Sequence, residues 1–485
     1  MSSNTAYMYA KNLKLDTRPY PSNGEILERI KKKFLMLPIE WLYQNTEQNR
    51  TNITNTKICA QSPTLLDIEY HNTYWQGYTN KNLTFKVFGA YWDSREAVVE
   101  GPLVRVLVMV NQIDRPFYKS YCQLWYDDTD EPEIVEVKTY DSIWVGAWGN
   151  KPRHLYPYLM NCQAPKFFIS DTNIIERIPK RVSLVAEKCD MATNNVRIIY
   201  EEPLAYSEGK AVKSSFAVCV KSTFYSYVDM SARLVEWLEL LRLLGVEKVF
   251  MYKLQLHANV EKVLNHYEST GFVQLSPFTY ARGEPPFASF QNVTIIKDIL
   301  NKRTNELIAY NDCLYRNMYK YNYLALIDVD EIIMPLGKLI NWHELLEVAK
   351  SIKDPKCTNF ASYCFRNVYF PRFEGKPPYS EEVPPYFYML QHVIRVSNYT
   401  KEGHAVKCFH NTDFVVSLHN HYSRKYLQSC FQLAIDKKYA HIQHYREPDL
   451  KATLNDTVID DSIWRYKDTL MSRSMKVLKS LNFLN

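Results

Sequence analysis

Short apolar runs alternate with longer helical runs through the second half of the chain, and this alternation constrains the fold more than any other feature. "FAVCVKS", "VEKVFMYK" and "FVQLSPF" have the length and composition of buried strands. Helical patterns separate them, and a further helix is expected at about residues 303–319. Strands that alternate with helices form a parallel sheet with helices on its faces. The sequence therefore predicts an α/β domain with a mostly parallel central sheet over residues 206–450.

The helical run "YVDMSARLVEWLELLRLLG" has two distinct sides. Glu236 and Glu239 fall on one side, and the other side carries the apolar residues Leu234, Val235, Leu238, Leu241 and Leu244. An apolar stripe of this spacing packs on a core, while the charged side of such a helix faces water. We therefore expect an amphipathic helix that ends at Gly245, because glycine readily takes the left-handed conformation of a helix C-terminus.

The flanking regions have a different character. Residues 1–80 are polar and rich in Asn and Thr, with one short amphipathic piece, and are predicted to form a partly disordered stem or linker. Residues 81–205 carry β-like runs such as "LTFKVFGAYW" and "LVRVLVMVNQI", separated by polar turns. They predict a smaller β-rich module that precedes the α/β domain. Residues 451–485 are predicted to be a helical C-terminal extension.

Composition excludes one class of partner and permits another. The net charge is only +6 over 485 residues, and Lys and Arg are dispersed, so the chain has no electrostatic footprint for nucleic acid. The aromatic content is high, with 37 Tyr, 22 Phe and 9 Trp. Tyrosine offers a flat apolar face and a hydroxyl, which suit a sugar or nucleotide site, although tyrosine also fills ordinary cores.

Ten cysteines and six N-x-[ST] sequons bear on the compartment. No cysteines form a CxxC pair, which disfavours zinc ribbons and thioredoxin-type sites. The sequons and the even cysteine count favour the secretory lumen, where disulfides persist; the alternative is an Asn-rich cytosolic protein with free thiols. The N-terminal "MSSNTAYMYAKNLKLD" lacks the apolar core of a signal peptide, and no run of about 18 apolar residues occurs. The sequons lie at Asn49, Asn52, Asn82, Asn292, Asn398 and Asn455.

The stretch "YNYLALIDVDEIIMP" places two aspartates directly after an apolar strand. Asp328 and Asp330 flank Val329, and alternation in an extended segment sends the two carboxylates to the same face. In open α/β sheets the ligand lies beyond the carboxyl ends of the strands. Two carboxylates there suit a hard cation such as Mg²⁺ or Mn²⁺, which usually also binds phosphate oxygens. A helix cap or a salt-bridged pair at a strand end is the structural alternative.

Three histidines surround a later apolar run within "KCFHNTDFVVSLHNHY", residues 407–422. They are His410, His419 and His421, and the last two share a face if the segment is extended. A histidine nitrogen is a plausible further ligand for Mn²⁺, and each histidine could equally be a hydrogen-bonded structural residue. The stretch "HIQHYREP", residues 441–448, adds Arg446, which could bind phosphate or pair with a neighbouring glutamate.

Four stretches in this order resemble glycosyltransferase family 92: "RLVEWLELLRLLGVEKVFMYK", "NDCLYRNMYKYNYLALIDVDEIIMP", "FRNVYFP" and "HIQHYR". The resemblance covers about residues 212–450. It implies a GT-A nucleotide-sugar-binding domain and an inverting, Mn²⁺-dependent transfer of galactose from UDP-galactose, onto fucose of an N-glycan core in characterised members. It also implies a type II membrane protein of the Golgi, although this sequence shows no anchor.

By this resemblance, Asp328 and Asp330 match the pair that binds the metal and the diphosphate. His419 lies where GT-A enzymes often place a late metal ligand. An inverting transfer also needs a general base that takes the acceptor hydroxyl proton. Glu331, beside the aspartate pair, and Asp413, beside the histidines, are the candidates for that base.

The resemblance suggests further contacts to the nucleotide. Lys221, at the end of the first strand, and Tyr252, at the end of the second, are expected to hold it. Asn311, Asp312 and Arg316 precede the strand that leads to the aspartates and are expected to support the nucleotide side.

Two other classes of protein remain as alternatives. A phosphohydrolase of the haloacid-dehalogenase type also places two aspartates after an apolar strand, the first as nucleophile. That group follows the pair with Gly or Ser, whereas Glu331 and Ile332 follow it here. A non-catalytic, lectin-like carbohydrate-binding protein could use the tyrosine-rich surface and would not need the paired aspartates.

Overall fold

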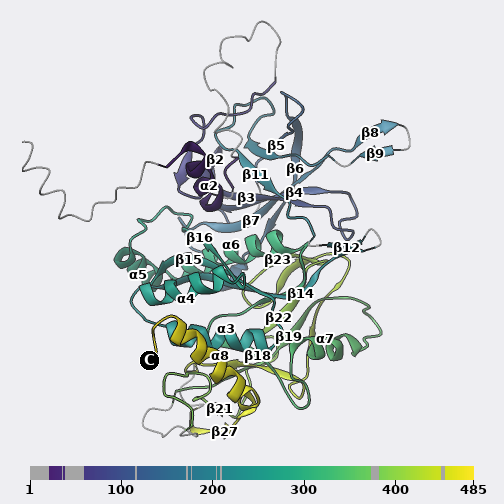
Figure 1. Cartoon of the computed structure of the whole chain (residues 1–485). Coiled ribbons are helices and arrows are strands. Elements are labelled where there is room, and N and C mark those ends of the chain that lie inside the picture. Colours follow the sequence, from purple (N-terminus) through teal and green to yellow (C-terminus); the bar gives the residue numbers. More distant parts are fainter. Residues whose placement is uncertain are drawn as a thin grey trace, which may run out of the picture.

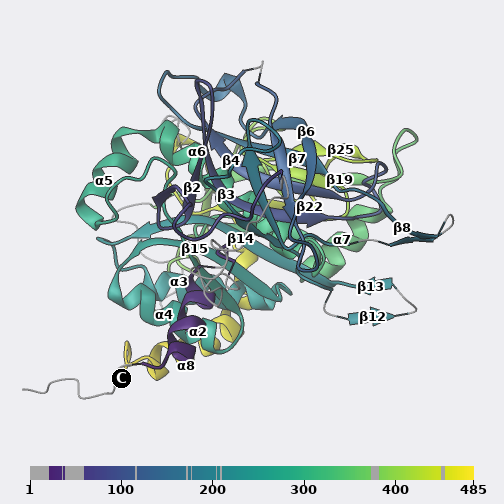
Figure 2. The same cartoon turned by 90° about the horizontal axis from the view of Figure 1, so that it is seen from above.

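The computed structural model describes residues 21–34, 36–38, 59–114, 117–170, 173–175, 177–203, 205–207, 210–372, 382–448 and 454–485. Two sheets lie on either side of one long helix, α6 (Ile299–Asn317), as Figure 1 shows. Strands of the N-terminal half form the first sheet, and strands from Ser214 onward form the second. Seen from above, the first sheet lies over α6 and the second sheet (Figure 2). Sequons Asn49 and Asn52 lie outside the described residues.

Nine strands form the N-terminal sheet: β1 (Tyr70–Asn72), β2 (Trp75–Asn80), β3 (Leu83–Asp93), β4 (Leu103–Val110), β5 (Tyr121–Trp125), β6 (Glu133–Ser142), β7 (Tyr156–Gln163), β10 (Arg181–Val185) and β11 (Val196–Ile199). Their order is β1-β2-β3-β11-β10-β5-β6-β7-β4, and a further pairing of β4 with β3 closes seven of them into a barrel. All pairings are antiparallel except that of β11 with β3. β1 and β2 come from the stretch predicted as linker, because Trp75 and Tyr78 have apolar side chains that the barrel buries.

A helix and three short elements accompany this barrel. The helix α2 (Asn23–Lys33) begins at Ser22, which forms a capping box with Glu25, so the amphipathic piece of the predicted stem is helical. One hairpin, β8 (Phe167–Ser170) with β9 (Asn173–Ile175), lies between β7 and β10, and a second, β12 (Ala205–Ser207) with β13 (Lys210–Val212), follows β11. A short 3₁₀ turn, η2 (Gly146–Trp148), precedes β7.

Seven strands form the second sheet: β14 (Ser214–Tyr225), β15 (Lys248–Leu256), β16 (Val273–Pro277), β17 (Tyr321–Leu326), β19 (Phe360–Phe365), β22 (Lys407–Asn411) and β25 (Cys430–Ala434). Their order is β16-β15-β14-β17-β22-β19-β25. The first four strands are parallel, and β22 is antiparallel to both of its neighbours. The sheet is therefore mixed. The expected parallel arrangement holds from β16 to β17 and again between β19 and β25, and β22 interrupts it. A parallel neighbour needs a crossover connection, usually a helix, and the described part of the chain has no helix between β19 and β22.

Helices cover both faces of the parallel strands. On β14, Phe216, Val218 and Val220 pack in the core with α3 (Ser231–Leu243) and α4 (Ala258–Ser269), whereas Ala217 and Cys219 pack on the α6 side. This alternation is that of a strand whose two faces are both buried. The other helices are α5 (Ala288–Lys297), α7 (Trp342–Ser351) and α8 (Lys467–Ser480), and a 3₁₀ turn, η4 (Ser462–Tyr466), leads into α8.

Small sheets complete the second half of the chain. The strand β18 (Glu331–Pro335) pairs with β26 (Ala440–His444), which also pairs with β20 (Asn367–Tyr369). Two further pairs are β21 (Ile394–Val396) with β27 (Thr457–Ile459), and β23 (Val415–Leu418) with β24 (Ser423–Tyr426).

Among the helices that the structure describes, none is long and apolar enough to span a membrane.

The expectation that one side of α3 faces water is wrong. Glu236 and Glu239 are both buried, because residues 388 to 390 and α4 cover the side of α3 that carries them. The Glu236 carboxylate accepts three backbone N–H groups, from residues 388 to 390, and Glu239 accepts the hydroxyl of Tyr267. The three amides lower the pKa of Glu236 but do not offset its burial, which raises that pKa to about 7.

All ten cysteines form disulfides. Cys219–Cys313 joins β14 to α6, and Cys59–Cys189 joins the residues ahead of β1 to the N-terminal sheet. The remaining pairs are Cys122–Cys162, Cys357–Cys430 and Cys364–Cys408. Of the sequon asparagines that the structure describes, Asn82, Asn398 and Asn455 are exposed and Asn292 is half-buried.

Candidate active site

The predicted aspartates lie in a tight turn between β17 and β18. Leu324 to Ile327 are fully buried, so the strand delivers Asp328 to the edge of the core. The Glu331 amide donates to the Asp328 carbonyl at 2.9 Å, and the Asp328 amide donates to Glu331 Oε2 at 2.9 Å. Val329 points into the core, while Asp328 and Asp330 both line one cavity. The two carboxylates share one cavity as predicted, but a turn, and not the alternation of an extended segment, presents them.

This cavity, which we call the aspartate cavity, lies at the carboxyl ends of the adjacent parallel strands β14 and β17, and its volume is about 880 Å³. Four carboxylates and six cations line it. The acidic residues are Glu306, Asp328, Asp330 and Glu331, and the basic residues are Lys221, Arg233, Lys302, Arg303, Lys407 and Arg446. Two more positive than negative charges make the aspartate cavity a site for an anion.

Lys221 and Lys407 hold Asp328 from two strands. Lys221 Nζ lies 3.0 Å from Asp328 Oδ2, and Lys407 Nζ lies 3.8 Å from the same oxygen. Lys407 also lies 3.1 Å from Glu331 Oε2. Burial opposes ionisation of Asp328, but the two ammonium groups outweigh it and hold the pKa of that carboxyl well below its usual range. Asp328 is therefore ionised at neutral pH.

His444 faces the second aspartate. Its Nε2 lies 3.7 Å from Asp330 Oδ2, and its Nδ1 lies 3.1 Å from Asn367 Oδ1. Burial would raise the pKa of Asp330, yet the contact with His444 lowers it below its ordinary value. His444 and Lys407 are functional candidates that sequence reasoning missed. His444 stands in the stretch "HIQHYR", which was the available sequence signal. The structure makes it a site residue, because β26 pairs with β18 in a register that sets His444 opposite Glu331.

The predicted late metal ligand lies elsewhere. His419 is fully buried outside the aspartate cavity, stacked on Tyr422 and edge-on to Trp148 at a ring-centroid distance of 4.0 Å. It follows the end of β23, so strand alternation no longer governs where its ring points. His421 lines the aspartate cavity instead, with Nδ1 held 3.1 Å from the Val406 carbonyl. Burial lowers the pKa of His421 to about 3, so the ring is neutral and able to bind a metal.

The two predicted general bases have other partners. Asp413 lies on the turn after β22, about half exposed, and pairs with Lys213 away from the aspartate cavity. Glu331 does line the cavity, but its Oε2 accepts the Asp328 amide and contacts Lys407. It holds the turn that presents the two aspartates.

The predicted nucleotide contacts divide between two places. Lys221 lies in the aspartate cavity as predicted, although β14 continues past it to Tyr225. It stands just beyond Cys219, the last residue of β14 that pairs with β17. Tyr252, Asp312 and Arg316 line a separate apolar cavity on the other side of α6, because their side chains face the N-terminal sheet. Asn311 is fully buried, where its side chain bonds the amide and the carbonyl of Leu418 on β23. These four residues join parts of the fold and do not reach the aspartate cavity.

The aspartate pair fits a hard divalent cation whose remaining ligands come from a substrate. Asp328 Oδ1 is buried without a hydrogen-bond partner, and Asp330 keeps part of its carboxylate exposed to the cavity. Among the described residues, no three His, Cys, Asp or Glu side chains stand close enough together to hold a metal by themselves. Mg²⁺ and similar ions in nucleotide sites take one or two carboxylates and complete their shell with phosphates and water. The donor set therefore suits a cation that arrives with a phosphate ligand.

The fold and the cavity define an enzyme-like α/β protein with an anion site at the carboxyl ends of its parallel strands. The sequence profile of glycosyltransferase family 92 matches residues 214–482, which are more than half of the chain. The protein belongs to glycosyltransferase family 92. This assignment favours a transferase over the phosphohydrolase alternative.

Comparison with individual proteins adds one relative and two distant structures. Beta-1,4-galactosyltransferase galt-1 of Caenorhabditis elegans is 22% identical over 257 residues, and the match spans 52% of this chain and 51% of that protein. The chain thus matches about half the length of this curated relative. The crystal structure of S. aureus TarS 1-349 is 13% identical, with a TM-score of 0.25 over 55% of this chain and 72% of that one. The apo structure of the WbbM bifunctional glycosyltransferase gives 12% identity and a TM-score of 0.19 over 36% and 26%. Both scores are too low to support an argument.

Proposed function

We propose that this protein is a metal-dependent, inverting glycosyltransferase of the GT-A type that transfers a hexose from a nucleotide diphosphate sugar to a glycan. The observation that carries the proposal is the aspartate cavity, where Asp328 and Asp330 follow the end of β17 and lie among six cations. Membership of family 92 and the galactosyltransferase relative support galactose as the sugar and UDP-galactose as the donor. A fucose on the core of an N-glycan is the acceptor that we propose.

The charges of the cavity support a diphosphate ligand. A diphosphate carries the negative charge that the excess of two cations would balance. Lys221 and Arg233 approach from β14 and α3, and Lys302 and Arg303 approach from α6. In a cavity of low dielectric, fixed cations stabilise the charge that develops on the leaving diphosphate without any reorganisation of solvent. The chain's own side chains would thus bind the donor and favour departure of the nucleotide.

Asp328 and Asp330 would hold Mn²⁺ or Mg²⁺ against the diphosphate. Such an ion would neutralise charge on the leaving group. Lys221 and Lys407 keep Asp328 ionised, and Glu331 fixes the turn so that both carboxylates face the cavity. His421 is the histidine of the predicted cluster that lines the same cavity, and it replaces His419 as the proposed further ligand.

Glu306 is the carboxylate that we propose as the general base. It lies on α6 within the aspartate cavity, contributes to neither the turn nor the aspartate pair, and has one oxygen buried without a hydrogen-bond partner. Its nearest charged groups are Lys221 at 3.6 Å and Lys302 at 3.8 Å. In an inverting transfer this carboxylate would take the proton of the acceptor hydroxyl as the hydroxyl oxygen attacks the sugar carbon. Glu306→Gln should then lower turnover while binding of the donor is retained.

The secretory pathway is the proposed location. Five disulfides and at least three exposed sequons fit an oxidising compartment in which N-glycans are added. The Golgi lumen, where glycans are extended, is the expectation from the family resemblance. Co-fractionation of the protein with a Golgi marker would support this location, and a cytosolic distribution with free thiols would contradict it.

A transfer assay tests the proposed activity. The wild-type protein is incubated with UDP-galactose and a fucosylated N-glycan, with Mn²⁺ or with EDTA, and compared with Asp330→Asn. We expect galactose transfer that needs Mn²⁺ and falls at least about a hundredfold in the variant, as when a single group that stabilises the transition state is removed. Asp436→Asn is the matched control, because Asp436 is exposed and lies outside the aspartate cavity.

Binding measurements separate the parts of the proposal. Metal-dependent UDP binding without transfer would mean that the donor sugar or the acceptor is different, while the site is correct. Absence of any metal-dependent nucleotide binding by the folded wild-type protein would contradict the proposed function and favour a non-catalytic carbohydrate-binding protein.

A further inference from the structure

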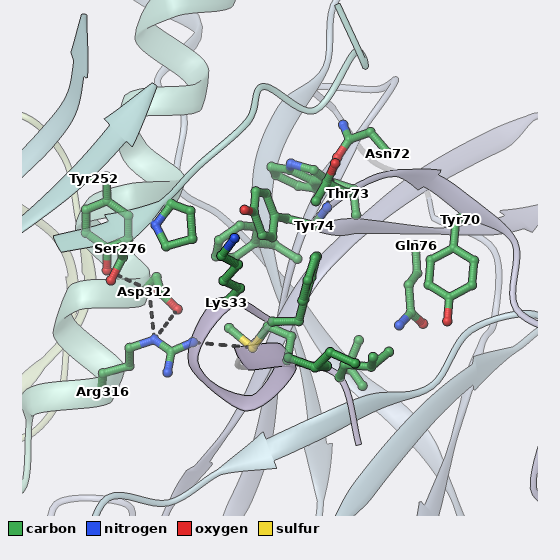
Figure 3. A pocket seen from close by; sticks show the side chains of 18 of the residues that line it. Lys33, Tyr70, Asn72, Thr73, Tyr74, Gln76, Tyr252, Ser276, Asp312 and Arg316 are labelled. Atoms are coloured by element: carbon green, nitrogen blue, oxygen red, sulfur yellow. Dashed lines mark hydrogen bonds and ion pairs between the residues drawn. The ribbon is translucent and has the colours of Figure 1, made fainter. Parts of the chain in front are cut away.

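A second cavity lies between the N-terminal sheet and α6, and we call it the interdomain cavity (Figure 3). Its volume is about 590 Å³, and it shares no lining residue with the aspartate cavity. The helix α2 and the residues after it form one wall, β1 and β2 another, and Tyr252, Ser276 and Arg316 approach from the side of the second sheet and α6. Cavities of this size, at an interface between domains, commonly bind small molecules.

The walls of the interdomain cavity are mostly aromatic and aliphatic. Aromatic rings of Phe34, Tyr70, Tyr74, Trp75 and Phe88 line it together with several aliphatic side chains. The amide, indole and carboxylate groups of the lining already have partners inside the protein. Gln76, for example, exchanges two hydrogen bonds with the backbone of Asn195, and Asn72 bonds Tyr280, Tyr74 and Thr279. An apolar ligand body would therefore fit the walls without disrupting these hydrogen bonds.

The carboxylate of Asp312 also has its hydrogen-bond partners inside the protein. Its carboxylate accepts the hydroxyls of Tyr252 at 2.6 Å and of Tyr91, and it receives Arg316 Nε at 2.9 Å. These contacts use both carboxylate oxygens. Asp312 thus fixes Arg316 in place and has little capacity to bind a ligand itself.

Arg316 has donors that the protein does not satisfy. Arg316 is only 9% exposed. Its Nη2 donates only to the thioether sulfur of Met36 at 3.5 Å, and a thioether is a weak acceptor. Within the described part of the chain, no oxygen accepts from either terminal nitrogen of this guanidinium. The dashed line from Arg316 to the sulfur in Figure 3 marks this contact at the edge of the cavity. A buried arginine with free donors at the base of an apolar cavity is an arrangement that binds a carboxylate oxygen strongly.

We propose that the interdomain cavity binds an amphipathic carboxylate, with its apolar body among the aromatic rings and its carboxylate on the Arg316 guanidinium. The Asp312–Arg316 pair is neutral as a unit, and Lys33 adds a positive charge to the lining, so an anionic head group completes the charge balance. The ligand displaces the weak contact between Arg316 and Met36. The site is independent of the proposed glycosyl transfer, which uses the other cavity.

Calorimetric titration of the full chain with octanoate tests the proposal, with 1-octanol as a neutral probe of the same apolar body. We expect octanoate to bind in a one-to-one complex and 1-octanol to bind at least roughly tenfold more weakly, the loss typical when a hydrogen bond to a charged group is removed. Arg316→Gln should weaken octanoate binding by a similar factor and leave 1-octanol binding nearly unchanged. Arg29→Gln, an exposed arginine on α2 outside the cavity lining, should bind octanoate as the wild type does.

A second variant keeps the test decisive if Arg316→Gln does not fold. Ser276→Phe adds an aromatic ring to the floor of the interdomain cavity and removes no charge, so it should abolish binding of both probes while circular dichroism stays that of the wild type. The proposal is overturned if octanoate shows no saturable binding to the wild type. It is equally overturned if octanoate and 1-octanol bind alike, or if Ser276→Phe folds and still binds octanoate.

Discussion

Lys221 Nζ lies 3.0 Å from Asp328 Oδ2, so a lysine on β14 neutralises the first aspartate after β17. The two strands are parallel neighbours, and both end at the aspartate cavity. Lys221 extends on the α6 side of its strand, where it also approaches Glu306. The lysine thus neutralises one carboxylate of the site before any ligand binds. It occupies Oδ2 of Asp328, and Oδ1 is left without a partner.

Replacement of Lys221 by Gln should weaken binding of UDP. The substitution removes a partly buried cation from the anion site and leaves Asp328 with Lys407 alone, so the carboxylate repels a diphosphate more strongly. We expect roughly tenfold weaker binding, or more, in a titration with UDP and Mn²⁺. Lys350→Gln, which removes an exposed lysine of α7, is the control, and equal affinities of the two variants would contradict the assigned role of Lys221.

Arg95 joins the N-terminal sheet to the second half of the chain. It is buried with Asp93, 2.7 Å away, and its Nη1 donates to the carbonyls of Thr412 and Val415. Arg95→Met would leave Asp93 with Arg105 only and would remove the donors of two carbonyls. We expect a loss of about 3 kcal/mol in the free energy of unfolding, measured by denaturant titration.

The exposed Arg473 of α8 provides the comparison for this variant. Arg473→Met removes the same charge and should change the free energy of unfolding by less than about 0.5 kcal/mol. If the two variants are equally stable, the buried Arg95 contacts do not contribute to stability as argued.

Local patterns predicted the parts of the fold that depend on near neighbours. The alternation after Ser214 gives the four parallel strands β14, β15, β16 and β17, and the apolar run Leu324–Ile327 places the aspartates at a strand end. The same reasoning failed for α3, because Glu236 meets backbone amides at residues 388 to 390 that no local pattern connects to it. A two-sided helix in sequence becomes a buried helix when a distant segment, here residues 388 to 390, packs on its polar side.

The candidate site shows the same division. Asp328 and Asp330 follow the end of β17, Lys221 lies on β14, and the structure brings all three to one cavity. Lys407 and His444 enter that cavity from β22 and β26, whose antiparallel pairing with β17 and β18 is set over long separations in the chain. Sequence position likewise suggested that Asn311, Asp312 and Arg316, which lie on α6 just ahead of β17, hold the nucleotide. Their helical positions instead send Asp312 and Arg316 to the opposite side, toward the N-terminal sheet.

The Cys219–Cys313 disulfide should stabilise the contact between β14 and α6. Both cysteines are fully buried and 94 residues apart in sequence, so the bond closes a long loop in the unfolded chain. Cys219→Ala with Cys313→Ala should lower the free energy of unfolding by about 2–5 kcal/mol. Because α6 carries Glu306 and Lys302, UDP binding should weaken in the same variant near its unfolding temperature.

The less buried Cys357–Cys430 pair offers a control for this disulfide. It lies at the edge strand β25, away from the aspartate cavity. Its double alanine variant should retain UDP binding at temperatures at which the Cys219 variant has lost it. If the Cys357–Cys430 variant instead loses UDP binding at the lower temperature, the β14–α6 disulfide does not support the site.

His410 makes stability depend on pH in a defined direction. The ring is buried on β22 with Nδ1 2.8 Å from Ser362 Oγ, and burial, with Lys407 nearby, lowers the pKa of His410 from 6.5 to about 3. A lowered folded-state pKa means that the unfolded chain binds the proton first as the pH falls. The stabilising contribution is therefore complete above about pH 6.5 and is lost progressively between pH 6.5 and pH 3.

Free energies of unfolding measured across this range, for the wild type and His410→Asn, isolate the effect. The wild type should lose up to about 1.4 kcal/mol more per pH unit than the variant, since one proton fewer is taken up when the variant unfolds. Other buried histidines remain in both proteins and cancel in the difference. His404→Asn removes an exposed histidine and should follow the wild-type slope. A His410 variant whose slope matches the wild type would show that the folded protein protonates this ring at its ordinary pKa, against the burial that the structure shows.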